Sequence, residues 1–137
     1  MRFEVLDISG DVGIRVFGRS LGELFINSAS GMYNLITNTE KVERKRNIDI
    51  QLQSHSLDGL LVSWLNELIF QFDTYGFIGR DIEIKELSEY KIKASISGED
   101  FDETRHEKRL LVKAATYHQL RVEKVGEEWK AEIIFDI

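Results

Sequence analysis

The sequence contains no cysteine and no proline in 137 residues. Without cysteine there is no disulfide, no zinc–thiolate site, no iron–sulfur cluster and no thiol nucleophile. Because disulfides are typical of secreted proteins, their absence favours the cytoplasm as the place where this protein works. The lack of proline leaves the turns to glycine, asparagine, aspartate and serine.

Long apolar runs are also absent. The most apolar stretch, residues 60–72, is interrupted by Ser, Asn, Glu and Gln side chains, whereas a membrane-spanning helix needs about 20 mainly apolar residues. Near the N-terminus, Glu4 and Asp7 interrupt the sequence where a signal peptide would need an unbroken apolar segment. We therefore expect neither a membrane span nor a secretory signal.

The charge balance is acidic, with 24 acidic and 18 basic residues and a formal net charge of −6. A protein that binds nucleic acid over much of its surface needs a large positive footprint, so direct nucleic-acid binding is not expected, although a local basic patch is compatible with the sequence. With 42% hydrophobic and 31% charged residues, the composition is that of an ordinary folded protein. The length predicts a single domain over residues 1–137.

Two segments have the periodicity of amphipathic helices. Ser20 and Glu23 have the spacing of a capping box, and apolar residues then recur along one stripe as far as Ile36. Ser56 can cap a second helix. The apolar residues of this second helix follow the helical repeat without a miss: Leu57, Leu60, Leu61, Trp64, Leu65, Leu68, Ile69 and Phe72.

Alternating patterns predict about eight strands, with Gly76 and Gly79 bounding a short connector and residues 100–109 forming a charged loop. The predicted strands are residues 3–8, 12–17, 48–53, 82–87, 90–97, 110–113, 118–125 and 129–136. Hairpin turns favour a largely antiparallel arrangement. The expected fold class is α+β, with two long helices packed on a curved, largely antiparallel sheet.

The familiar catalytic motifs are missing. The sequence has no GxxxxGK[ST] phosphate loop, no GxGxxG that opens a helix, no HExxH and no GxSxG elbow. Its histidines, His55, His106 and His118, lack the spacing of metal ligands. An enzyme is therefore not expected, and a metal-dependent hydrolase is disfavoured because no general base accompanies the carboxylates considered next.

Acidic groups near both ends of the chain are candidates for cation binding. Asp11 lies in a tight break between two predicted strands, where it could instead simply bond its own backbone. At the other end, a predicted strand runs into Asp136 and Ile137, which places a side-chain carboxylate beside the terminal one. Their repulsion could be relieved by water or by a hard cation such as Ca²⁺, which prefers oxygen ligands.

The run from Lys113 to His118 combines side chains that donate and accept hydrogen bonds between two apolar segments. With the basic residues of the preceding segment 105–109, it is locally basic in an acidic protein. The run is either a binding segment or only a loop that leads into a strand with solvated side chains.

Taken together, these residues resemble the archease family. The resemblance covers essentially the whole chain, including the helix core at Trp64–Leu68, and the last two of its motifs are specific in combination. These motifs are Gly98-Glu99-Asp100-Phe101-Asp102, His106, Lys113-Ala114-x-Thr116-Tyr117-His118-x-Leu120 and the terminal Phe135-Asp136-Ile137.

The resemblance implies a cytoplasmic accessory protein of the RtcB-type RNA ligase, which joins RNA ends in tRNA splicing and RNA repair. Members of the family promote the metal-dependent guanylylation of the ligase by GTP and allow multiple turnover, but are not nucleotidyl transferases themselves. A general chaperone or modulator of RNA-modifying enzymes, without a metal-dependent role, is the alternative.

The resemblance also implies a divalent metal, expected to be calcium, bound by Asp11, Asp136 and the terminal Ile137. The sequence departs from the family at Ile8-Ser9-Gly10-Asp11, where His-Thr-Ala-Asp is usual, so the aspartate is kept and the histidine is not. An oxygen site for Ca²⁺ does not require imidazole. The candidate contacts with a partner protein are Lys113, Thr116, Tyr117, His118 and His106.

Overall fold

The computed structural model describes residues 3–8 and 10–137, except that the side chains of His118 and Gln119 lie outside the description. Within this range the chain forms two long helices, one short 3-10 helix and seven strands. Their order is β1 (Phe3–Ile8), β2 (Asp11–Gly18), α1 (Leu21–Ile36), η1 (Thr39–Lys41), β3 (Arg46–Gln53), α2 (Leu57–Tyr75), β4 (Phe77–Leu87), β5 (Lys91–Asp100), β6 (Ala114–Val125) and β7 (Glu128–Asp136).

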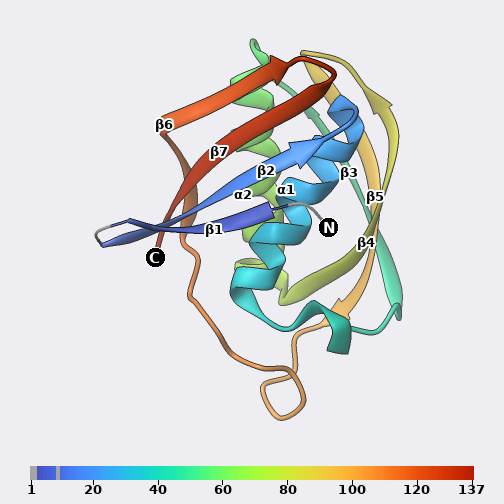
Figure 1. Ribbon diagram of the computed structural model, residues 1–137. Helices are drawn as coiled ribbons and strands as arrows, with labels where there is room; N and C mark the ends of the chain where they lie inside the picture. The colour runs from blue at the N-terminus through green and yellow to red at the C-terminus, as the bar shows by residue number, and fades with distance from the viewer. Residues whose placement is uncertain (1–2, 9) are drawn as a thin grey trace.

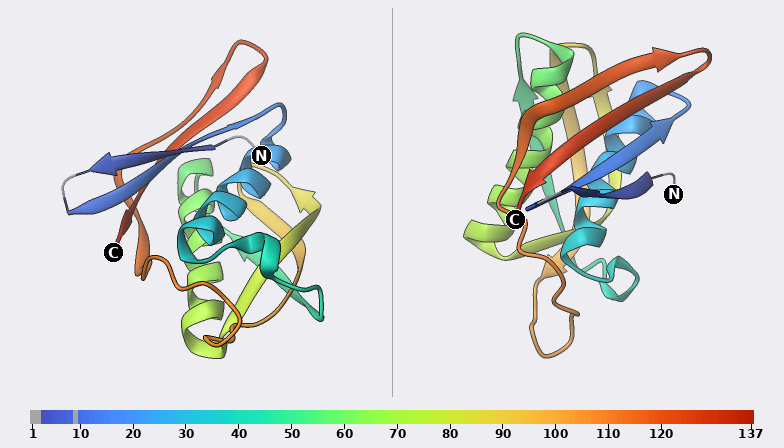
Figure 2. Two further views of the ribbon diagram at one scale, coloured as in Figure 1. Left: turned by 60° about the horizontal axis from the view of Figure 1, so that its bottom comes forward. Right: turned by 60° about the vertical axis from the view of Figure 1, so that its left-hand side comes forward.

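The strands form two antiparallel sheets. One sheet has the order β1-β2-β7-β6 and the other the order β3-β5-β4. Both helices lie between the sheets and contact each of them (Figures 1 and 2). The α+β class is confirmed, and the strands are antiparallel throughout the described pairs.

One hydrophobic core joins the two sheets and the helices. In β2, the alternate residues Val12, Ile14 and Val16 face the helices and are buried. Because α2 has a sheet on either side, its apolar stripe is wide, and Leu60 and Trp64 have no exposed surface. Neither helix of the described chain is long and apolar enough to cross a membrane.

Both helices begin where the sequence predicts. The Ser20 hydroxyl accepts a hydrogen bond from the Glu23 N–H at 3.1 Å, and the Ser56 hydroxyl accepts one from the Gly59 N–H at 3.0 Å. These bonds satisfy amides that have no partner within the first helical turn. Helix α2 ends at Gly76, whose φ of +70° is readily adopted by glycine.

The predicted connector between Gly76 and Gly79 is wrong, because β4 starts directly at Phe77 and includes Gly79. The aromatic ring of Tyr33 in α1 packs against this glycine, and a Cβ there would come within 2.8 Å of Tyr33 Cε2. Gly79 is therefore required by close helix–strand packing and not by a turn.

The predicted strand at residues 110–113 is also wrong. Residues 101–113 form a long loop without regular secondary structure, and the N–H groups of Arg109 and Leu110 donate at 3.0 Å to the carbonyls of Ile36 and Leu35. These carbonyls are left without helical partners at the end of α1, so the loop satisfies them instead of forming a ladder. Strand β6 starts at Ala114, earlier than the predicted 118.

Candidate functional site

Asp11 and Asp136 come from the first hairpin and the last strand, which pair with each other. The hairpin joins β1 to β2 through a turn at Gly10, and β2 pairs with β7 up to Val12 opposite Phe135. Asp11 and Asp136 are the next residues of the two strands beyond this last pair. Because strand side chains alternate, both aspartates project from the face opposite to the buried Val12 and Phe135.

The end of the chain lies beside the same hairpin in both views of Figure 2. Asp136 is also opposite Ala114 of β6, and its carbonyl accepts a hydrogen bond from the Lys113 N–H at 2.8 Å. The Ile137 residue that follows is 40% exposed. The structure therefore brings all three predicted metal ligands to one corner of the four-stranded sheet.

The chemistry of Asp11, Asp136 and the terminal carboxylate of Ile137 suits a hard divalent cation. The donors would be two side-chain carboxylates and the terminal carboxylate, all of them oxygens, as Ca²⁺ prefers. Asp136 is exposed and Asp11 half-buried, which leaves room for water to supply further ligands. Among the described residues, no three His, Asp or Glu side chains converge on a point that could hold a metal, and this includes the corner with Asp11 and Asp136.

Ile8 has a packing role at the position where a histidine was expected. Its Cδ1 lies against the open face of Gly13, where an added Cβ would come within 3.1 Å of it. This contact covers the outer face of the hairpin next to Asp11 with apolar surface. The hairpin is thus held by packing and not by an imidazole.

A single side chain of α2 fixes the start of β6. The Ala115 N–H donates to Asn66 Oδ1 at 2.8 Å, and Asn66 Nδ2 donates back to the Ala115 carbonyl at 3.1 Å. Because β6 is an edge strand of its sheet, these backbone groups would otherwise have no ladder partner. Asn66 therefore helps to position the segment that pairs with Asp136.

The predicted partner contacts differ in their surroundings. Lys113 is exposed at the end of the loop, and Tyr117 is 63% exposed on β6. Thr116 is half-buried, and its hydroxyl donates to the Ile134 carbonyl at 3.0 Å. The backbone of His118 lies in β6, but its side chain is outside the described part of the structure. Among the described side chains of this set, Lys113 and Tyr117 are thus the accessible ones.

His106 is placed where it cannot meet a partner in this conformation, because its side chain has no exposed surface. The ring accepts a hydrogen bond at Nδ1 from the Asp102 N–H at 2.8 Å, which assigns the ring proton to Nε2. Nε2 lies 3.0 Å from Oε2 of Glu99, and the ring stacks on Phe101. His106 is therefore an internal support of the loop, and its prediction as a surface contact is corrected.

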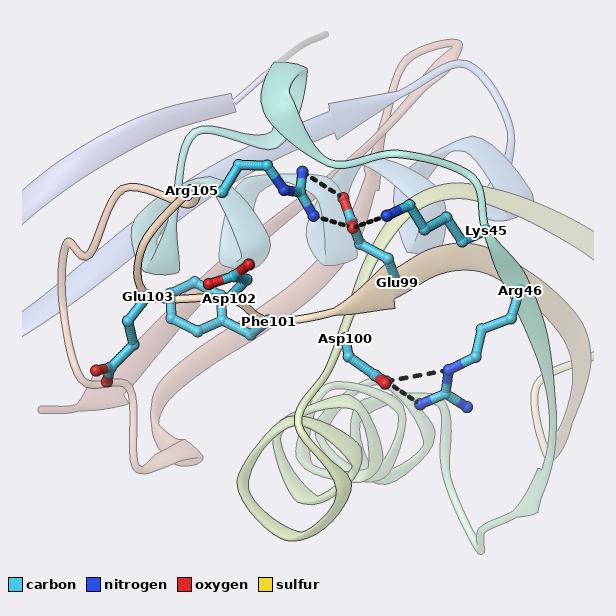
Figure 3. A pocket seen from close by; sticks show the side chains of 8 residues that line it. All are labelled: Lys45, Arg46, Glu99, Asp100, Phe101, Asp102, Glu103 and Arg105. Carbon is cyan, nitrogen blue, oxygen red and sulfur yellow. Dashed lines mark hydrogen bonds and ion pairs between the residues drawn. The ribbon is translucent and has the colours of Figure 1, made fainter.

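Glu99 is the buried centre of an ionic cluster with partly exposed cations, and the sequence reasoning missed this cluster (Figure 3). Its carboxylate is 2% exposed and pairs with Arg105, while Lys45 Nζ lies 3.7 Å from Oε1. Burial acts to raise the pKa of Glu99, but the hydrogen bonds that it accepts, that of Arg105 first, outweigh burial and lower the pKa to about 2. The sequence offers one hint, which is the basic Arg105-His106 pair that follows this glutamate.

The fold is that of a small α+β protein in which two helices lie between two antiparallel sheets. The family model of the Archease protein family (MTH1598/TM1083) matches residues 3–137. The chain belongs to the archease family.

Individual relatives agree with this assignment over their full length. Protein archease of Pyrococcus abyssi is 38% identical, with 99% of both chains covered, and protein archease of Methanosarcina mazei is 35% identical, with 99% of this chain and 96% of the relative covered. The solution structure of protein 1598 of Methanobacterium thermoautotrophicum is 31% identical, covers 98% of each chain and superposes with a TM-score of 0.76.

The crystal structure of an archease from Thermotoga maritima, described as a possible chaperone, has a TM-score of 0.67 at 19% identity. It covers 100% of this chain and 98% of its own, and at that identity it supports the fold alone.

Proposed function

We propose that this protein is the accessory protein of an RtcB-type RNA ligase and works in the cytoplasm in tRNA splicing and RNA repair. It promotes the metal-dependent guanylylation of the ligase and is not itself the catalyst. Membership of the archease family supports this function, together with the absence from the sequence of the catalytic motifs considered above. The observation that supports the proposal is the pairing of Val12 with Phe135, beyond which Asp11 and Asp136 are the next residues of adjacent strands.

In this proposal, Asp11, Asp136 and the terminal carboxylate of Ile137 hold a divalent cation, with Ca²⁺ as the expected ion. The ion would neutralise the repulsion between these carboxylates and tie the hairpin to the last strand. Lys113 stands beside this corner as an accessible polar group for the ligase, and Tyr117 is a further one along β6, on the side of Gly59 in α2. The chain's own residues thus fix the geometry of a surface that the ligase recognises.

The direct test is ligase guanylylation by GTP with Asp11→Asn and Asp136→Asn variants. Loss of a metal-ligating oxygen should lower the stimulation of the ligase by at least about tenfold. Asp49→Asn is the matched control, because Asp49 is an exposed aspartate on the other sheet and should leave the stimulation unchanged. Undiminished stimulation by both site variants would contradict the proposed role of the cation.

A general chaperone or modulator of RNA-modifying enzymes is the competing function, and the Thermotoga maritima relative is described as a possible chaperone. The two differ in stoichiometry. An activator that allows multiple turnover stimulates the ligase at substoichiometric amounts, whereas a holding chaperone must match its client. A titration of this protein against a fixed amount of ligase separates them.

A further inference from the structure

Strand β6 pairs with β7 in two separate parts. Residues 114–116 pair with residues 134–136, and residues 121–125 pair with residues 128–132, with an irregularity between the two parts. The turn that joins the two strands sets the register of the second part directly, whereas the irregularity lets the first part shift relative to it. The first part, which includes the pair with Asp136, therefore needs another source of register.

The register of this first part decides what lies beside Asp136. As the structure has it, Ala115 is buried opposite Phe135, and Ala114 lies opposite Asp136. A slip of one residue would exchange the faces of Ala114 and Ala115 and change the residue opposite Asp136. Because residues 114–116 form so short a pairing, few ladder bonds hold them against such a slip.

Asn66 fixes this register from α2. Its side-chain amide bonds the N–H and the carbonyl of a single residue, Ala115, at 2.8 and 3.1 Å. A slip by one residue would break both bonds and leave half-buried polar groups without partners, which is costly. The neighbouring Trp64 and Leu65 are fully buried in the core, so α2 is a firm support for this contact.

The segment that Asn66 fixes continues directly into the candidate cation site. Lys113, at the start of this segment, donates its N–H to the Asp136 carbonyl at 2.8 Å. On the other side, the pairing of β7 with β2 ends at Phe135 and Val12. Asp136 lies beyond this last pair, so β6 is the strand that holds its main chain.

We propose that Asn66 is a positioning residue for the proposed cation site. By fixing residues 113–116 against α2, it holds the main chain of Asp136. The carboxylates of Asp136 and Ile137 then lie where one ion can join them to Asp11. The inference rests on the proposed function, because the ion belongs to that function. Both polar atoms of the Asn66 amide are already used, so Asn66 is not a ligand; it lowers the cost of ordering the ligands.

The coupling is reciprocal, because an ion that binds the ordered segment also stabilises its order. Ca²⁺ should therefore slow hydrogen exchange at the amides of Lys113 and Ala115 in the wild-type chain by at least about fivefold. The Ser54 amide, which donates to the Tyr90 carbonyl at the end of the other sheet, is the control and should exchange at the same rate with and without Ca²⁺.

Calcium calorimetry on the wild-type chain, Asn66→Ala and Asn38→Ala tests the proposal, at a temperature where circular dichroism shows all three to be folded. Asn38→Ala is the matched control, because it loses a comparable bond, from the Glu40 N–H to the Asn38 side chain, in another part of the chain. The Kd for Ca²⁺ should rise at least about fivefold for Asn66→Ala and stay within about twofold for Asn38→Ala.

The outcomes separate this inference from the proposed function. Equal Ca²⁺ affinity in all three proteins overturns the positioning role and leaves the proposed function standing. An equal loss in both variants means that overall stability sets the affinity, and it also overturns the positioning role. If the wild-type chain binds no Ca²⁺, the proposed cation and the positioning role are both overturned. If Asn66→Ala does not fold, the exchange measurement on the wild type decides: rates at Lys113 and Ala115 that Ca²⁺ leaves unchanged overturn the inference.

Discussion

At the scale of single residues, Glu99 is the clearest case of a polar group that the fold depends on. Its buried carboxylate joins the end of β5 to Arg105 and His106 of the loop and accepts the Glu43 N–H. The carboxylate is buried while Arg105 is 37% exposed, so the cost of losing Glu99 comes chiefly from the charge-assisted hydrogen bonds that its oxygens accept. Glu99 therefore stabilises the loop that carries Leu111 and leads into Lys113.

Glu99→Gln should lower the free energy of unfolding at pH 7 by about 2 kcal/mol, because the buried carboxylate loses its charge and with it the charge-assisted hydrogen bonds from the Glu43 N–H and Arg105. Urea unfolding followed by circular dichroism measures this difference. Glu103→Gln is the control, because Glu103 is exposed and pairs only with the exposed Lys108 among the described residues, so its loss should cost less than about 1 kcal/mol. Equal stability of the two variants would contradict the role assigned to Glu99.

The pKa of Glu99 also fixes the pH range of its contribution. The folded-state pKa is lowered from 4.5 to about 2, so the carboxylate stabilises the fold fully above pH 4.5 and loses this effect as the pH falls toward 2. The difference in unfolding free energy between wild type and Glu99→Gln should therefore shrink over this range. A difference that is constant from pH 5 to pH 2 would show that ionisation of Glu99 is not its source.

At the scale of elements, the helices and most strands follow from their patterns, whereas the loop and the strand ends do not. Capping residues and apolar periodicity are local, so Ser20 and Ser56 mark the helix starts directly. The start of β6 depends on Asn66, which lies in another element, and the missing strand at 110–113 depends on the carbonyls at the end of α1. Sequence patterns contain no signal for such distant hydrogen bonds.

The residues of the candidate site also differ in how far the sequence could predict them. Asp11 and Asp136 could be named because the resemblance to the family points to them, and the antiparallel register then brings their strands together. His106 could not be assigned correctly, because a histidine in a charged stretch gives no sign that Glu99 and Phe101 enclose it. The burial of a polar side chain is decided by the partners that the fold provides.

The contact between α2 and β6 gives a prediction at this scale. Asn66→Asp removes the donor to the Ala115 carbonyl, so it should destabilise the protein by about 1–3 kcal/mol and accelerate hydrogen exchange of the Ala115 amide. Asn38→Asp is the matched control, because Asn38 uses only its oxygen, to accept from the Glu40 N–H, and an aspartate can do the same. Exchange at Ala115 that is unchanged in Asn66→Asp would contradict the positioning role of Asn66.

At the scale of the whole molecule, the two sheets contribute differently to the structure. The three-stranded sheet and the two helices supply much of the core, while the four-stranded sheet brings the first hairpin and the last strand to one corner. The loop from 101 to 113 connects the two sheets and is fastened to α1 on its way. The proposed cation site thus lies where this connection joins the four-stranded sheet, at the Lys113 N–H that donates to the Asp136 carbonyl.

Calcium calorimetry tests the central claim, that the termini share one cation, most directly. The protein that ends at Ile137 is compared with a protein carrying extra residues after Ile137, which converts the terminal carboxylate to an amide, and with one carrying the same residues before Met1. Since a charged ligand is lost only in the first extension, we predict Ca²⁺ binding weakened at least about tenfold there and unchanged in the second. Equal Ca²⁺ affinity in all three proteins, or no binding by any of them, would contradict the account.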